Sequence, residues 1–207
     1  LKKDVVEHLF SSYPWVTGII IALTVRPNVS YFALAVASVM AIYFGKLVFG
    51  GFGQNIFNPA GVGRAIIAIS FGSAVVADVV SGATPTSTIS SYGWLMNGAN
   101  ASAFLNDFGG LTNMALGLYQ GAIGETCSVL LIVVGIVLAW RKVIDWKVPT
   151  IYVSTVFVLS LLVGLMNGQG LWYPLFSVLT GGVLFGAVFM LTDPVTNPTS
   201  SSGRVIF

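Results

Sequence analysis

Residues 148–192 contain no Asp, Glu, Lys or Arg, and this long uncharged run restricts the fold more than any other feature of the chain. Charged residues make up only 8% of the whole sequence, whereas a soluble domain carries about 25%. Soluble enzymes, disordered tails and nucleic-acid-binding proteins all need more charge or a polar shell. The sequence therefore predicts an all-α fold, a polytopic transmembrane helical bundle in contact with the lipid bilayer, with no nucleic-acid partner.

Six apolar segments are expected to form this bundle, at 13–25, 30–49, 58–76, 115–140, 148–166 and 171–192. The second, fourth, fifth and sixth are long enough to cross about 30 Å of hydrocarbon at about 1.5 Å per residue. The third begins with Asn58-Pro59 after the glycine-rich run 50–53. Proline suits the first turn of a helix, and glycine lets the preceding backbone turn sharply. This pattern predicts a broken or half helix that enters the membrane part-way.

A weak internal similarity predicts an inverted repeat. Three pairs of residues recur in the same order in two blocks, Phe49-Gly50, Asn58-Pro59 and Gly63-Arg64 in one and Phe185-Gly186, Asp193-Pro194 and Gly203-Arg204 in the other. Internal repeats are a common construction of membrane transporters. Chance similarity is the alternative, because the spacing between Pro and Gly-Arg differs between the blocks.

Basic residues outside the apolar segments predict the orientation of the chain. If all six segments span the membrane and the N-terminus is cytoplasmic, only Arg26 faces outward, and the cytoplasmic residues are Lys2, Lys3, Lys46, Arg141, Lys142 and Lys147. The chain then forms a single transmembrane domain, 1–207, whose loop 77–114 lies on the outer side. Because the sequence begins at Leu1 and ends at Phe207 within an apolar run, we expect a fragment of a longer protein.

The outer loop contains the motif Ser81-Gly82-Ala83-Thr84. On composition alone, a segment rich in Ser, Thr, Gly and Pro is an ordinary connector. The motif nevertheless resembles the flavin-attachment signature of the membrane subunits of Rnf electron transport complexes and of Na+-pumping NADH:quinone oxidoreductases. Three further blocks resemble the same family in the same order, namely 53–64, Gly124-Glu125-Thr126 and 192–198. The proline after Thr84 and the short spacing between blocks favour the D subunit of the Rnf complex over the B subunit of the quinone-reducing pump.

This resemblance implies that FMN is joined through its phosphate to the hydroxyl of Thr84. It also implies a membrane component of an ion-translocating ferredoxin:NAD+ oxidoreductase in a bacterial or archaeal inner membrane. Electron transfer through this FMN would be coupled to export of Na+ or H+. The iron–sulfur and flavin subunits of the complex would be its partners, and a second, non-covalent flavin is left open.

The flavin phosphate needs hydrogen-bond donors, and the loop 79–106 contains no cation. We therefore expect backbone N–H groups at Gly82, Ala83 and the next helix start to surround it, with Ser81 beside them. Other candidate cofactor contacts lie in the matching blocks, namely Asn58, Arg64, Asp193 and Thr196. Glu125 and Asp193 are the candidates for a cation pathway, since carboxylates at membrane depth are costly unless they serve a function.

These candidates also have simpler interpretations. Arg64 and Arg204 each lie in or beside an apolar run, where they face either an interior carboxylate or the membrane surface. Glu125 and Asp193 would equally suit helix N-termini. No metal site is expected, because the chain has one histidine, His8, and one cysteine, Cys127. An inverted-repeat channel or solute transporter without a redox role is the alternative function.

Overall fold

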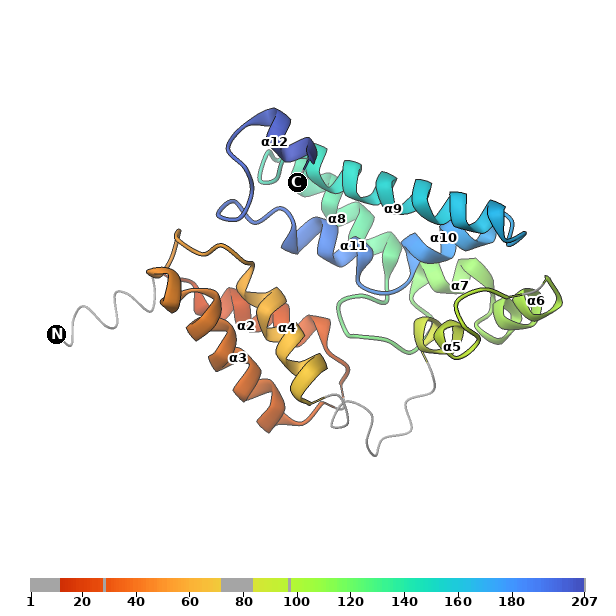
Figure 1. Cartoon of the computed structure of the whole chain (residues 1–207), viewed down its shortest axis with the longest axis horizontal. Coiled ribbons are helices and arrows are strands. Elements are labelled where there is room, and N and C mark those ends of the chain that lie inside the picture. Colours follow the sequence, from red (N-terminus) through yellow and green to blue (C-terminus); the bar gives the residue numbers. More distant parts are fainter. Residues whose placement is uncertain (1–11, 28, 72–83, 97, 207) are drawn as a thin grey trace. The chain divides into compact units, whose positions relative to one another are not determined.

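The computed structural model describes residues 12–27, 29–71, 84–96 and 98–206, and within these ranges it is helical with no strand. The chain divides into two compact units, which are considered separately below. The first unit comprises residues 1–79 and 193–198, and the second comprises 80–192 and 199–207. Figure 1 shows the helices of each unit coloured along the sequence. The expectation of an all-α membrane fold is confirmed.

The first unit contains α2 (Pro14–Thr24), α3 (Tyr31–Gly45), the short 3-10 helix η1 (Leu47–Phe49) and α4 (Pro59–Ser70). Its core is formed by small and branched apolar side chains of these helices and the α2–α3 connection, namely Ile21, Val25, Val29, Ala33, Ala37, Ala41, Ala60 and Ile67. Because alanine recurs at every fourth position of α3, one face of this helix is almost flat. Helix α4 packs closely against that face, with Gly63 beside Ala41 and Pro59 beside Gly45.

The second unit begins with three short helices, α5 (Pro85–Ser91), α6 (Gly98–Asp107) and α7 (Gly110–Leu116). The predicted loop 77–114 is therefore largely helical where the structure describes it. These helices gather around aromatic side chains, and the ring of Phe104 lies 5.4 Å from that of Phe176 and 6.1 Å from that of Trp172 between centroids. These short helices thus share an apolar core with Trp172, Tyr173 and Phe176 of the sixth apolar segment.

The long helices of the second unit are α8 (Ser128–Trp140) and α9 (Lys147–Met166), followed by α10 (Trp172–Leu179), α11 (Val183–Phe185), the π-helix η2 (Gly186–Met190) and α12 (Ser201–Ile206). Helix α9 lies alongside α10 and η2 (Figure 1). Helices α10 and α11–η2 are bent relative to each other by 57° at residues 180–182. The sixth apolar segment therefore forms two helices joined at a sharp bend, as in a broken span or a re-entrant loop, rather than one continuous helix.

Two helices in the described residues are long and apolar enough to cross a membrane, Tyr31–Phe49 and Lys147–Met166, and the bent pair would make a third. Leucine and valine side chains on α9 are exposed, as expected for a surface that faces lipid. The prediction for the fourth segment, 115–140, was wrong in length. Its helix begins only at Ser128, because Gly117 ends α7 in the left-handed conformation and turns follow.

Candidate functional site

Thr84 is the N-cap of α5, where Pro85 is the first helical residue. Its Oγ1 accepts a hydrogen bond of 3.2 Å from the backbone N–H of Ser87. Threonine at this position satisfies an N–H group that would otherwise lack a partner at the helix start. The residue is only 8% exposed. Thr84 therefore has a structural role in the local fold, whatever else its hydroxyl does.

Hydroxyl groups surround Thr84. Ser87 Oγ lies 3.0 Å and Thr86 Oγ1 lies 3.2 Å from Thr84 Oγ1. The carbonyl oxygen of Thr84 accepts hydrogen bonds from the hydroxyls of Ser87 at 2.9 Å and of Thr88 at 3.1 Å. Such donors fit the oxygens of a phosphoester, which is the group that the resemblance attaches here. The other motif residues, Ser81, Gly82 and Ala83, lie outside the described residues.

Glu125 lies in the turn before α8 and is 8% exposed. Its backbone N–H donates to the carbonyl of Ala122 at 3.1 Å, and α8 itself begins three residues later at Ser128. Cys127 is the N-cap residue, and the first turn of α8 contains no acidic residue. The prediction that Glu125 opens the helix and interacts with its dipole was therefore wrong. The carboxylate instead lies against Gly182, in the break between α10 and α11.

Tyr119 shares this region with Glu125. Burial raises the pKa of Tyr119 to about 12, and the carboxylate of Glu125 acts in the same direction. The phenol hydroxyl is buried and has no hydrogen-bond partner among the residues that the structure describes. A neutral hydroxyl of this kind supplies a proton donor and an acceptor close to a carboxylate. The sequence analysis did not select Tyr119, because one tyrosine in an apolar segment is an ordinary packing residue by sequence.

The break at residues 180–182 has its own polar contacts. The Ser128 hydroxyl donates to the carbonyl of Leu179, the last residue of α10. The Thr180 hydroxyl donates to the carbonyl of Phe176 at 2.7 Å. Carbonyl groups at the end of a helix lack intrahelical partners, and in an apolar environment they need side-chain donors. The Ser128 bond therefore supplies a donor to a carbonyl at the break, whereas the Phe176 carbonyl also accepts from the backbone N–H of Thr180 at 3.0 Å.

The remaining candidates for cofactor contacts belong to the first unit. Asn58 is the N-cap of α4 and accepts hydrogen bonds from Ala60 N at 2.9 Å and Gly61 N at 3.3 Å. Arg64 is exposed on α4, and Thr196 is half-buried. Asp193 accepts a hydrogen bond of 3.1 Å from the backbone N–H of Val195 in a turn. The next helix begins at Ser201, so Asp193 does not cap it.

The two blocks of the predicted repeat differ in local structure. Asn58-Pro59 begins α4 directly, whereas Asp193-Pro194 is followed by turns that continue to Ser201. The described break in a span lies at residues 180–182, and neither proline pair had predicted it. The inverted repeat stays a prediction.

Lys46 is a buried cation that sequence reasoning treated as a surface marker of orientation. The side chain is 6% exposed, and its Nζ donates to the carbonyl of Ser12 at 2.8 Å. The same Nζ lies 5.7 Å from the centre of the Phe52 ring, and the ammonium interacts electrostatically with the carboxylate of Asp193. A buried cation beside a candidate carboxylate is a functional candidate in a membrane protein. Counting charges along the sequence could not reveal it.

Arg204 faces a carboxylate, which is one of the two placements expected for it. Its guanidinium donates to Asp145 Oδ2 at 2.9 Å and joins α12 to the turn before α9. The hydrogen bond from Arg204 lowers the pKa of Asp145, and the backbone N–H of Lys147 adds to this effect. Arg204 thus has a structural partner in its own unit.

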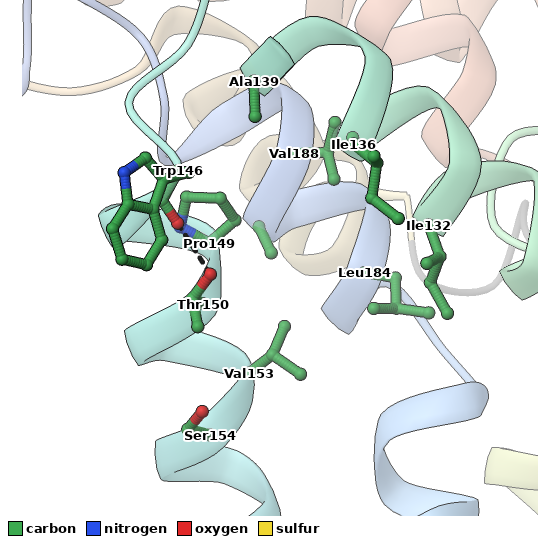
Figure 2. A pocket seen from close by; sticks show the side chains of 12 residues that line it. Ile132, Ile136, Ala139, Trp146, Pro149, Thr150, Val153, Ser154, Leu184 and Val188 are labelled. Carbon is green, nitrogen blue, oxygen red and sulfur yellow. Dashed lines mark hydrogen bonds between the residues drawn. The ribbon is translucent and has the colours of Figure 1, made fainter.

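An apolar cavity of about 310 Å³ lies between α8, α9 and the α11–η2 segment. Figure 2 shows Ile132, Val153 and Leu184 lining it, with the Thr150 hydroxyl turned to the carbonyl of Trp146. None of the candidate site residues lines this cavity. The candidate flavin and cation residues are therefore separate from the apolar cavity in the second unit.

Comparison with known proteins identifies the family that this sequence matches. A sequence model of the NQR2, RnfD, RnfE family matches residues 2–207. The D subunit of the proton-translocating ferredoxin:NAD(+) oxidoreductase complex of Clostridium ljungdahlii is 34% identical, over 93% of this chain and 60% of that protein. The D subunit of the Na(+)-translocating ferredoxin:NAD(+) oxidoreductase complex of Acetobacterium woodii is 32% identical, over 100% of this chain and 62% of that protein. The D subunit of an ion-translocating oxidoreductase complex of Stutzerimonas stutzeri is 32% identical, over 92% of this chain and 62% of that protein.

The chain spans about 60% of the length of these relatives. The expectation drawn from the four sequence blocks is confirmed at the level of the family. Because the match of the family model extends over almost the whole chain and the described fold is an all-α membrane fold, the chain belongs to the NQR2, RnfD, RnfE family.

Proposed function

We propose that this chain is the flavin-bearing membrane part of an Rnf-type ion-translocating ferredoxin:NAD+ oxidoreductase, with FMN joined through its phosphate to Thr84. The observation that carries the proposal is the Thr84 hydroxyl itself. It belongs to the Ser-Gly-Ala-Thr motif, and the hydroxyls of Thr86 and Ser87 lie within hydrogen-bonding distance of it. When bound, FMN supplies reversible electron uptake, and the protein sets its position and surroundings.

The chain's own residues would orient the phosphate. The N–H of Ser87 donates to Thr84 Oγ1, and the Thr86 hydroxyl can donate to it, whereas the Ser87 hydroxyl accepts from Thr84 Oγ1 and donates to the Thr84 carbonyl. A negative phosphoester in this place needs donors because the described residues 84–96 include no cation. Backbone N–H groups of Gly82 and Ala83, with Ser81, complete the proposed surroundings. Asn58, Arg64, Asp193 and Thr196 are proposed as candidate flavin contacts within the first unit, where a second, non-covalent flavin is left open.

Ion export is proposed to involve the carboxylates of Glu125 and Asp193. Glu125 is nearly buried, and Asp193 lies within electrostatic reach of the buried ammonium of Lys46. Similarity to relatives does not choose the ion, since the names of two about equally similar relatives specify protons in one and Na(+) in the other. The iron–sulfur and flavin subunits of the complex are the proposed partners, because this chain carries no motif for ferredoxin or NAD+.

The test separates the structural role of Thr84 from its role as flavin acceptor. Thr84→Asn keeps a good N-cap but removes the hydroxyl, whereas Thr84→Ala removes both and costs about 1 kcal/mol in helix capping. Each variant is produced with its flavin transferase and examined by in-gel fluorescence and intact mass. We expect the wild type and Thr88→Ala to carry the flavin, and both Thr84 variants to lack it. A fluorescent Thr84→Asn protein would refute the proposal.

Two alternatives are distinguished by further measurements. A B subunit of the Na+-translocating NADH:quinone oxidoreductase would co-purify with a quinone-reducing activity instead of ferredoxin:NAD+ oxidoreductase activity. An inverted-repeat channel or solute transporter would carry no covalent flavin at all. The proposed placement of the flavin loop on the outer side is tested by the accessibility of a tag inserted between residues 85 and 105 to a membrane-impermeant reagent.

A further inference from the structure

The break between α10 and α11 contacts both segments that the proposed function uses. Successive glycines, Gly181 and Gly182, form the break together with Thr180. Gly181 faces the segment that begins with Thr84, and Gly182 faces Glu125. Residues far apart in the sequence thus meet at one point of the second unit.

The contact with Glu125 requires glycine at position 182. A Cβ built on Gly182 would lie 2.8 Å from Oε1 and 3.3 Å from Cδ of Glu125. The distance to Oε1 is shorter than packed atoms allow and the distance to Cδ is tight, so a methyl group at position 182 requires the carboxylate to shift. Because the carboxylate ends a side chain with rotatable bonds, an added methyl group would move the carboxylate rather than the backbone.

The contact with the Thr84 segment passes through Thr86. A Cβ built on Gly181 would lie 3.5 Å from Thr86 Cγ2, which is ordinary van der Waals contact. Thr86 Oγ1 in turn lies 3.2 Å from Thr84 Oγ1. The glycine pair therefore lies between Thr86, which is bonded to Thr84, and the carboxylate of Glu125.

The break is held in place on both sides of the glycines. The Ser128 hydroxyl binds the Leu179 carbonyl, and the Thr180 hydroxyl binds the Phe176 carbonyl. Ser128 and Thr180 are 1% and 2% exposed. On the other side, Gly186 N–H donates to the Gly182 carbonyl at 2.8 Å. A displacement at either glycine would therefore be transmitted to its neighbour rather than absorbed by a loose loop.

We propose that the Gly181-Gly182 break is a positioning element that couples the flavin-bearing segment at Thr84 to the carboxylate of Glu125. This inference rests on the proposed function and deepens it. A change in the flavin segment would shift the glycine pair and with it the carboxylate, and ion binding at the carboxylate would act back on the flavin segment. Such reciprocity follows for any two sites whose binding free energies are linked. The sixth apolar segment thus supplies the coupling element, although neither proline pair lies in it.

The experiment compares two glycine variants in the complete, membrane-embedded complex. Gly182→Ala places a methyl group against Glu125, whereas Gly186→Ala, four residues later in the same segment, meets no atom within 4 Å. The readout is the rate at which dicyclohexylcarbodiimide labels Glu125, measured by peptide mass spectrometry with and without Na+. We expect Gly182→Ala to change that rate at least about threefold and Gly186→Ala to leave it unchanged, as expected for direct contact in one case only.

A second pair of variants tests the contact by compensation. Glu125→Asp shortens the side chain by one methylene and makes room for a methyl group at position 182. NAD+ reduction by reduced ferredoxin is measured in Gly182→Ala, in Glu125→Asp and in the double variant. We expect the double variant to reduce NAD+ at least about threefold faster than Gly182→Ala, because the two changes act on one contact. Additive losses would overturn the inference.

The coupling to the flavin segment needs its own comparison. Thr86→Ala removes the methyl group beside Gly181, and Thr84→Asn removes the proposed flavin. Both are expected to change the labelling rate of Glu125, and an unchanged rate in both would overturn the inference. If Gly182→Ala does not assemble into the complex, the labelling rates of Glu125 in Thr86→Ala and Thr84→Asn still decide the inference. If the wild type carries no covalent flavin, the proposed function fails, while Gly182→Ala and Thr86→Ala still decide whether the break positions Glu125.

Discussion

Gly117 ends α7 and offers the sharpest stability prediction in the second unit. Its φ of 81° lies in the left-handed region, and a Cβ there would lie 2.8 Å from the carbonyl carbon and oxygen of Thr126 and 2.9 Å from the backbone nitrogen of Cys127. Gly117→Ala therefore adds two costs. The left-handed conformation costs an L-residue about 1–2 kcal/mol, and overpacking typically costs about 1–3 kcal/mol. Because alanine restricts the unfolded chain more than glycine does, the substitution also regains about 0.4–1 kcal/mol of stability.

The expected net loss is about 1–5 kcal/mol, a large part of the free energy of unfolding of most domains. At Gly182 the added methyl group meets a side chain, but at Gly117 it meets the backbone of Thr126 and Cys127. No side-chain rotation can therefore relieve this clash. The free energy of unfolding would be measured in mixed detergent micelles by titration with sodium dodecyl sulfate. Because Thr126 follows Glu125, the same variant should also raise the labelling rate of that carboxylate.

Gly168 provides the matched control in the same unit. Its φ is 66°, and a Cβ built there meets nothing within 4 Å. Gly168→Ala therefore places an L-residue in the left-handed conformation without a steric clash. After the reduced freedom of the unfolded chain is subtracted, we expect the free energy of unfolding to fall by about 1 kcal/mol or less. If Gly117→Ala loses no more stability than Gly168→Ala, the close approach of α7 to Thr126 is not a feature of the folded protein and the reasoning fails.

Two further predictions concern single polar contacts. Ser128→Ala leaves the carbonyl of Leu179 without its donor and should cost about 1–3 kcal/mol in the same titration. Ser177→Ala removes a hydroxyl that bonds only within its own helix and should cost clearly less, and equal losses would contradict this account of the break. The lowered pKa of Asp145 means that its pairing with Arg204 contributes stability above the ordinary value of 3.8 and loses it as the pH falls through the lowered value. Asp145→Asn should therefore speed hydrogen exchange in residues 201–206 at about pH 6, and the difference should shrink as the pH falls below 3.8; a difference that does not shrink in acid would contradict the pairing.

Sequence reasoning located most helices because hydropathy is a local property. The segments 13–25, 30–49 and 148–166 became α2, α3 with η1, and α9 within a few residues. It failed at 171–192, since glycines inside an apolar run suit a tightly packed helix as well as a break. The 57° bend, together with the bond from Ser128 of another helix to the carbonyl of Leu179, shows that the segment is interrupted there.

Some residues of the candidate site could be selected from the sequence and others could not. Thr84 was selected from a motif, and its place as a helix N-cap follows from Pro85 and the hydroxyl residues beside it. Glu125 stays a candidate site residue, and it lies in the turn before α8 rather than at the start of that helix. Lys46 and Tyr119 were not selected, because burial of a single cation or a single phenol depends on helices from elsewhere in the chain.

The sequence by itself determined the class of the protein and its family. The scarcity of charge requires a membrane environment, because a bundle this apolar cannot be covered by its own polar groups in water. The four sequence blocks and their order then specify the family. These properties are read from the chain because they depend on which residues are present and in what order.

Only the tertiary structure decided which residues meet. Gly181 and Gly182 are two of 24 glycines in the sequence, and nothing nearby in the chain distinguishes them. Folding places them against Thr86 and Glu125, where the available space is set by distances of about 3 Å between segments roughly 60 to 100 positions apart. Close packing of distant segments is a cooperative property of the fold, and that is why the proposed coupling could be recognised only in three dimensions.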